Sequence, residues 1–145
     1  MQVDFYHLTQ QPLDRVLPRI AERVVEGGGR LLIVAENEAQ RSALDRLLWT
    51  YAPESFLAHA QSGEGEEDQP ILIASDVNAA NRARNIALAD GMWRDDALDF
   101  ERAFHFFDED RIREARAAWK ALADREGVER RYWKQNETGR WEQAA

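Results

Sequence analysis

Residues 27–37 read GGGRLLIVAEN, and this stretch decides the fold class. Residues 30–35 read RLLIVA, and the continuous apolar run after Arg30 is typical of a strand buried on both faces of a parallel sheet. The glycines before it end the helix expected over residues 11–26, where apolar side chains recur at helical spacing. Asn37 is expected to cap the next helix by accepting a backbone hydrogen bond in its first turn. A helix, a buried strand and a second helix in this order predict an α/β fold.

Short apolar runs repeat this pattern along the chain. Further strands are expected at residues 3–8, 54–59, 71–74, 83–90 and 102–109. A last helix is expected from about residue 110 to 125, followed by an aromatic and basic segment. We therefore predict one domain over residues 1–145 with a largely parallel central sheet flanked by helices. Residues from about 135 to 145 are expected to form either an ordered strand or a flexible tail.

Charge is distributed unevenly along the chain. The net charge is −8, and residues 1–110 carry ten Lys and Arg against 21 Asp and Glu. Residues 111–134 instead carry eight basic against four acidic side chains. An acidic surface repels phosphate, so we expect little direct nucleic-acid binding, whereas the basic segment can attract an anion or an acidic peptide. A salt-bridged, solvated helix face explains the same basic segment.

The sequence contains no recognised catalytic, metal or cofactor motif. The glycines at 27–29 close a helix, whereas a phosphate-binding loop must follow a strand and open a helix. The turn after residues 30–34 reads AENE and offers carboxylates where a phosphate needs N–H groups. His7 and His105 lie in expected strands, where a structural histidine with satisfied ring nitrogens is the default. We expect no catalytic residues, no cofactor and no metal.

Composition indicates a cytoplasmic protein. The chain has no Cys, which excludes disulfides and thiol catalysis. No apolar run approaches the roughly 18 residues of a membrane helix, and neither a signal peptide nor a transit peptide is visible. No membrane partner is therefore expected.

The late helix carries a cluster of basic residues. Arg113, Arg116 and Lys120 are spaced so that they share one helix face, and Arg111 adds to the same positive field. Trp119 follows Arg116 by three residues and so lies beside it. A guanidinium next to an aromatic ring can hold a carboxylate attached to an apolar side chain. A salt-bridged helix with one buried Trp accounts for these residues equally well.

A second aromatic cluster lies in residues 47–59, which read LLWTYAPESFLAH. Trp49, Pro53 and Phe56 stand near an expected helix end without a nucleophile, a metal-ligand pair or a phosphate loop. Large aromatic side chains without catalytic groups favour a surface that binds another protein.

Several segments together resemble a known family. They are VDFYHL (3–8), LLWTYAPESFLAH (47–59), PILIA (70–74), NIALADG (85–91), FERAFHFFDE (100–109) and ARAAWKAL (115–122). In order, spacing and aromatic content, the chain is similar over nearly its whole length to the chi subunit of bacterial DNA polymerase III. The resemblance implies a Rossmann-like fold without a functional nucleotide site, and a non-catalytic accessory role in DNA replication.

The resemblance also implies two partners. Chi links the clamp loader, through the psi subunit or an equivalent one, to the acidic C-terminal tail of single-stranded DNA-binding protein. The implied tail-binding residues are Arg111, Arg113, Arg116, Trp119, Lys120 and Phe106. Ile112 stands where the family has a basic residue, so Arg111 or Arg113 would supply that charge. The implied psi or clamp-loader interface contains Trp49, Pro53 and Phe56. The protein would then work at replication forks, associated with the nucleoid.

Two other functions compete with this one. A Rossmann-like crevice could serve a small nucleotide-binding domain or enzyme, although the acidic AENE turn disfavours it. The aromatic and basic C-terminal segment could instead bind single-stranded DNA directly, which the net charge disfavours.

Overall fold

The computed structural model describes residues 1–51, 58–61 and 66–145. In chain order the elements are β1 Gln2–His7, α1 Leu13–Glu26, β2 Leu31–Val34, α2 Glu38–Thr50, β3 His59–Gln61, η1 Glu66–Asp68, β4 Ile71–Ala74, β5 Asn85–Leu88, η2 Asp95–Asp99, β6 Arg102–Phe107, η3 Glu109–Arg111, α3 Ile112–Leu122, β7 Glu129–Gln135 and β8 Trp141–Gln143. The labels η1 to η3 denote short 3-10 helices. Most of the candidate strand at 54–59 lies outside the described residues.

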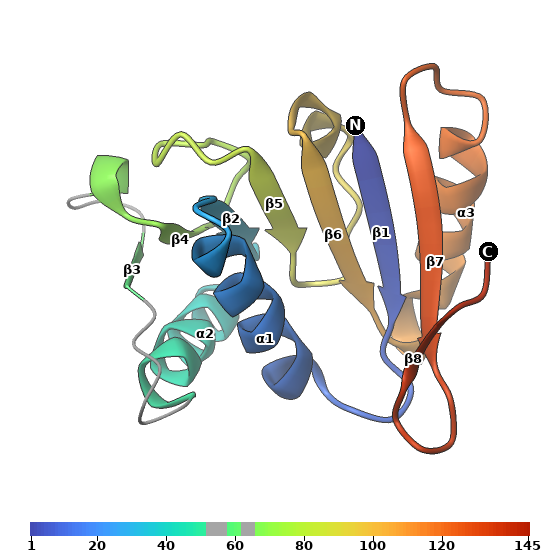
Figure 1. Ribbon diagram of the computed structural model, residues 1–145, viewed down its shortest axis with the longest axis horizontal. Coiled ribbons are helices and arrows are strands. Elements are labelled where there is room, and N and C mark those ends of the chain that lie inside the picture. Colours follow the sequence, from blue (N-terminus) through green and yellow to red (C-terminus); the bar gives the residue numbers. More distant parts are fainter. Residues whose placement is uncertain (52–57, 62–65) are drawn as a thin grey trace.

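The described strands form one sheet in the order β3-β4-β2-β5-β6-β1-β7-β8 (Figure 1). Every neighbouring pair is parallel except β7 and β8, which are antiparallel. The prediction of an α/β fold with a largely parallel sheet flanked by helices is confirmed. The arrangement is Rossmann-like, because parallel strands are joined by crossovers that place helices on both faces.

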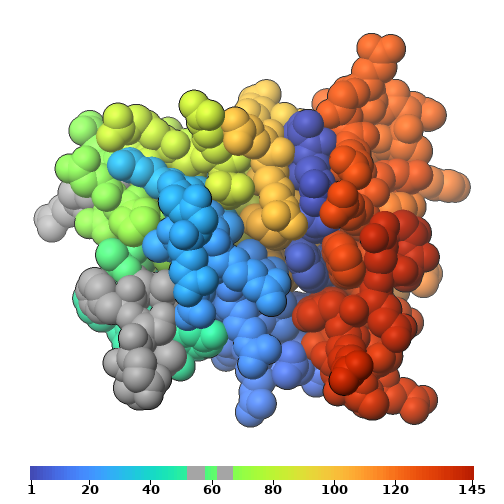
Figure 2. Space-filling view, viewed as in Figure 1, coloured from blue at the N-terminus to red at the C-terminus, as the bar shows by residue number. Residues whose placement is uncertain are grey.

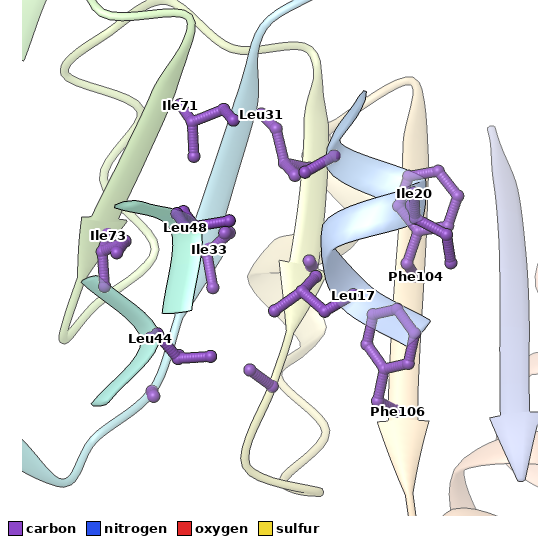
Figure 3. Close-up of a cluster of buried hydrophobic side chains, with 14 of the residues drawn as sticks. Leu17, Ile20, Leu31, Ile33, Leu44, Leu48, Ile71, Ile73, Phe104 and Phe106 are labelled. Carbon is purple, nitrogen blue, oxygen red and sulfur yellow. The ribbon is translucent and has the colours of Figure 1, made fainter. Parts of the chain in front are cut away.

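Helices α1 and α2 cover one face of the sheet (Figure 1). Leu17 and Ile20 of α1 pack near Phe104 and Phe106 of β6, as Figure 3 shows. In the same cluster, Leu44 and Leu48 of α2 pack against the apolar strands β2 and β4 (Figure 3). Helix α3 and η2 cover the opposite face, where the alternate side chains of β1 and β6 point. Both faces are thus buried, which explains the continuous apolar strands at 31–34 and 71–74.

Local signals in the sequence placed most elements correctly. Asn37 caps α2, because its side chain accepts a hydrogen bond from the backbone N–H of Gln40 at 3.0 Å. The glycines at 27–29 follow α1 directly, and Gly28 has a positive φ of 82°. The segment from residue 128 onward forms β7 and β8, with β7 alongside β1. In the part of the chain that the structure describes, every helix is too short or too polar to span a bilayer.

His105 departs from the expectation of a satisfied structural histidine. His7 fits that expectation, since its ring nitrogens lie 2.8 Å from a Glu109 carboxylate oxygen and 3.2 Å from the Tyr132 hydroxyl. His105 is fully buried, and neither of its ring nitrogens has a hydrogen-bond partner among the described residues. Its ring packs edge-to-face against Phe5 and Trp93 instead. Burial lowers the pKa of His105 to about 4, so the ring is neutral at pH 7.

This buried histidine predicts a loss of stability in mild acid. The unfolded chain takes up a proton on His105 below its ordinary pKa of about 6.5, whereas the native state resists protonation down to about pH 4. Stability therefore falls as pH falls through this window, by about 2 kcal/mol from this residue between pH 7 and pH 5. We expect His105→Leu to remove most of that slope, measured as the unfolding free energy in urea. An unchanged slope in His105→Leu would contradict the assignment.

Candidate functional site

The basic residues of α3 lie on one exposed flank of that helix. Ala115, Ala118 and Leu122 are buried against the sheet. Arg113 and Arg116, with Lys120, are exposed on the side turned away from it. The helical period places them together, as the sequence predicts. The resulting surface is the positive part of what we call the α3–β7 patch, which comprises Arg113, Arg116, Trp119, Lys120, Arg130 and Tyr132.

Trp119 joins the basic flank to strand β7. The Arg130 side chain lies over its ring, with the guanidinium carbon 4.0 Å from the ring centroid. Arg130 also donates a hydrogen bond to the Trp119 carbonyl oxygen at 2.6 Å. The Tyr132 ring meets Trp119 edge-on at 5.6 Å. The site therefore contains an aromatic ring packed between a guanidinium and a second ring, a geometry stabilised by cation–π attraction.

Sequence reasoning missed Arg130 and Tyr132 as members of this patch. They alternate along β7, so both point to the side of the sheet that α3 covers. The alternation is visible in the sequence, but its use requires knowing that β7 pairs with β1 beside α3. That pairing joins residues more than 120 positions apart.

A hydrogen-bonded chain fixes Tyr132. Its hydroxyl lies 3.2 Å from His7 Nδ1, and His7 Nε2 lies 2.8 Å from Glu109. Burial raises the pKa of Tyr132, while the nearby Arg116 acts in the opposite direction and Glu109 adds to the rise. The phenol therefore stays protonated at neutral pH.

Two residues predicted for the same site lie elsewhere. Phe106 is 1% exposed and packs among α1 residues on the opposite face of the sheet, because neighbouring strand residues point to opposite faces. Phe107 is its counterpart on the α3 side. Arg111 lies against Gly91, where an added Cβ would approach the Arg111 Cγ to 2.7 Å. Its guanidinium is 3.8 Å from Glu114. The structure therefore brings Arg113, Arg116, Trp119 and Lys120 together without Phe106 or Arg111.

The second predicted surface is described only in part. Trp49 is 58% exposed near the end of α2, and its ring centroid is 4.8 Å from that of His59. His59 Nε2 lies 3.1 Å from an Asp45 carboxylate oxygen. Pro53 and Phe56 lie outside the described residues. Trp49 is thus a large apolar side chain held at the surface beside β3.

A cavity of about 600 Å³ lies at the carboxyl ends of β1, β5 and β6, where Rossmann-like folds bind ligands. Its lining includes Asp14, Asp90, Asp108 and Asp110, and among the described residues Arg111 is the one basic side chain that lines it. Asp90 is paired with Arg94, whose Nη2 lies 2.8 Å from Oδ2. This lining repels a phosphate or a dinucleotide.

Two carboxylates of this cavity, those of Asp90 and Asp108, are engaged by groups of the protein itself. Burial raises the pKa of Asp90, but hydrogen bonds from the Arg94 side chain and the Glu36 and Met92 backbones outweigh it, so the pKa lies below its ordinary value. Asp108 accepts a hydrogen bond from the Asp110 backbone N–H at 3.0 Å and caps η3. No group of three or more His, Asp or Glu side chains in residues 1–51, 58–61 and 66–145 is placed to hold a metal ion.

Comparisons with known proteins agree on one family. A family model described as DNA polymerase III chi subunit, HolC, matches residues 1–129. A protein named DNA polymerase III subunit chi from Escherichia coli K12 is 32% identical over 93 residues, which are 63% of this chain and 61% of the relative. One of the same name from Pseudomonas aeruginosa is 36% identical over 75 residues, or 50% of this chain and 52% of the relative. The matches thus span little more than half the length of these relatives.

The matched region covers nearly all of the fold, from β1 through α3 to the first residue of β7. The α3 part of the patch lies inside it, and Arg130 and Tyr132 lie just beyond. The chain belongs to the DNA polymerase III chi subunit family.

Proposed function

We propose that this chain is a non-catalytic accessory subunit of the DNA polymerase III holoenzyme. It would link the clamp loader, through psi or an equivalent subunit, to the acidic C-terminal tail of single-stranded DNA-binding protein during DNA replication. The observation that carries the proposal is the α3–β7 patch, in which Arg116, Trp119 and Arg130 converge on an otherwise acidic protein. Such a protein would work in the cytoplasm, at replication forks.

The patch offers a separate contact for each part of an acidic tail that ends in Phe. The terminal carboxylate would pair with the Arg116 guanidinium, with Arg130 as the second basic group. The Phe ring would pack against Trp119 and Tyr132, whose rings meet edge-on at 5.6 Å. Acidic residues before it would lie along Arg113 and Lys120. Arg130 would thus supply the basic group that Ile112 does not provide at the position where the family has a basic residue.

Electrostatics and valency would together make this contact effective. The basic flank of α3 steers an acidic peptide, whereas the acidic cavity at the carboxyl strand ends repels anions. A small interface of this kind gives roughly micromolar affinity that weakens with salt. Several tails on one coated DNA strand would raise the effective concentration, so each contact can be weak.

A second surface would bind the clamp loader. Trp49 is exposed beside β3, which is the edge strand at the opposite end of the sheet from β7 and β8. Pro53 and Phe56 are proposed to belong to the same interface. Aromatic side chains are enriched at the centres of protein interfaces, where they bury large areas. Separate surfaces at the two ends of the sheet suit a protein that bridges two partners.

The tail-binding proposal predicts the effect of removing one guanidinium. We expect Arg116→Ala to weaken binding of a labelled tail peptide by about tenfold or more, because a charge-assisted hydrogen bond to the carboxylate is lost. We expect Arg130→Ala to weaken it as well. Fluorescence anisotropy at low salt gives both affinities.

Arg46→Ala is the matched control, since Arg46 is an exposed arginine on α2, which covers the other face of the sheet. It should bind the peptide with unchanged affinity. A peptide lacking the terminal Phe should bind neither wild type nor Arg46→Ala. Equal affinities for Arg116→Ala and Arg46→Ala would refute the patch.

The clamp-loader proposal predicts a separable defect. We expect Trp49→Ala to lose co-purification with psi or the equivalent subunit, because the largest exposed apolar side chain is removed. Tail-peptide binding should stay at the wild-type value. Retention of the partner by Trp49→Ala would count against this surface.

The competing nucleotide-binding function has its own test. Because the cavity at the carboxyl strand ends is lined by four aspartates, we expect ATP and NAD to leave the melting temperature unchanged at millimolar concentration. The acidic tail peptide in excess should raise it. A rise with ATP or NAD would favour the nucleotide-binding alternative.

A further inference from the structure

One part of the sheet has no helix over it. On the side of α1 and α2, strands β1 and β7 are left uncovered between α1 and the β7–β8 hairpin (Figure 1). Figure 2 shows atoms of β1 and β6 at the surface in this gap. The strand register sets Tyr6 between Phe106 and Trp133, and Asp4 between Phe104 and Arg131. We call this surface the open sheet face.

Aromatic rings form a row across the open sheet face. The Tyr6 ring stacks with Phe106 at 5.3 Å and with Trp133 at 6.4 Å, with interplanar angles of 20° and 13°. Trp141 of β8 meets Tyr6 edge-on at 5.1 Å. Tyr6, Trp133 and Trp141 are all partly exposed. The rings stack on one another across neighbouring strands, so together they present a continuous aromatic surface against which a base can pack.

Arginines border this row of rings. A groove of about 310 Å³ runs between α1 and β6, and its lining includes Arg23, Arg102, Tyr6, Phe104 and Asn85. None of the residues that line it in the described part of the chain is an Asp or a Glu. The Arg102 guanidinium carbon is 4.7 Å from the Phe104 ring centroid. Arg23 is exposed and has no ion-pair partner among the described residues. The groove therefore attracts an anion.

Buried Asp4 holds side chains of the open sheet face in place and neutralises the charge of Arg102. Its carboxylate accepts hydrogen bonds from Arg102 Nε, from the Gln2 amide and from Trp133 Nε1, each at 3.0 Å. Arg102 is thus held in place and neutralised, while Arg23 keeps its charge. Arg19 precedes Arg23 by one helical turn on the same side of α1 and is also exposed. The open sheet face is thus bordered by exposed arginines although the protein carries −8.

The Tyr6 hydroxyl adds a neutral donor. Burial and the nearby Asp4 raise the pKa of Tyr6 to about 12, against the influence of Arg102, Arg23 and Arg131. The phenol therefore keeps its proton at neutral pH. Of these arginines, Arg23 and Arg102 line the groove together with Tyr6.

Guanidinium groups beside partly exposed rings are the chemistry by which proteins hold single-stranded nucleic acid. Backbone phosphates pair with arginines, and unstacked bases lie on the rings. An acidic peptide would use the arginines but leave the rings without planar partners. Duplex DNA would offer no free base faces to Tyr6, Trp133 or Trp141.

We propose that the open sheet face binds single-stranded DNA, with a phosphate at Arg23 and a base against the row formed by Tyr6, Trp133 and Trp141. This contact is separate from the α3–β7 patch, since it lies on the opposite face of the sheet. The acidic remainder of the surface keeps the contact weak and confined to the groove. Single-stranded DNA released from single-stranded DNA-binding protein would then bind the same subunit at a second surface.

The test is anisotropy of a labelled oligothymidine of about 15 nucleotides, titrated with the full chain at about 50 mM and about 200 mM salt. We expect binding at the lower salt and several-fold weaker binding with Arg23→Ala. Each lost phosphate contact reduces the slope of log affinity against log salt by about 0.7, so Arg23→Ala should show that reduction. Trp141→Ala should weaken binding by about tenfold if its melting curve stays cooperative.

Arg116→Ala is the matched control on the other face of the sheet. It should bind the oligonucleotide like wild type while losing the tail peptide, and Arg23→Ala should show the reverse. The two proposals therefore fail independently. Absence of oligonucleotide binding at low salt, or equal affinity for wild type and Arg23→Ala, would overturn the inference. The inference would also be overturned if an acidic peptide without Phe bound through Arg23 while the oligonucleotide did not bind.

Discussion

The parallel pairing of β1 with β7 is the contact on which both proposed binding surfaces depend. Residues 2–7 pair in register with residues 129–134, so the last part of the chain lies beside the first. Because side chains alternate along a strand, β7 then supplies both faces. Arg130 and Tyr132 point toward α3, whereas Arg131 and Trp133 point to the open sheet face. Without this pairing, α3 would carry its arginines but Trp119 would lack its partners on β7.

Net charge describes this protein poorly at the scale of a binding site. The chain is acidic overall, and the cavity at the carboxyl strand ends is lined largely by aspartates. Both candidate anion-binding surfaces are instead built from arginines beside aromatic rings, Arg130 on Trp119 and Arg102 on Phe104. Salt screens the interaction between exposed charges beyond about 8 Å at physiological ionic strength, so a local cluster can attract an anion that the whole molecule repels. The acidic remainder then limits binding to the clusters.

Local signals in the sequence were sufficient for most of the elements. Continuous apolar runs identified β2 and β4, and the asparagine cap located the start of α2. Helical spacing placed Arg113, Arg116, Trp119 and Lys120 on one flank of α3. These predictions succeeded because each depends on residues within one or two turns of each other. Phe106 was assigned to that site through the family resemblance, and Arg111 through the resemblance and its nearness in the chain. Strand alternation and the Gly91 contact place both side chains away from the flank.

The sequence by itself determined the fold class, the family and the basic flank of α3, because periodicity and motif order are local properties. Tertiary structure alone decided which side chains complete each surface. Arg130 meets Trp119, and Trp133 meets Asp4, through hydrogen bonds and ring contacts between elements. His105 is likewise an ordinary strand residue in the sequence. Among the described residues its ring nitrogens have no hydrogen-bond partner, because Phe5 and Trp93 pack around the ring. Strand order in a sheet is set by packing between distant segments, and a linear pattern does not encode it.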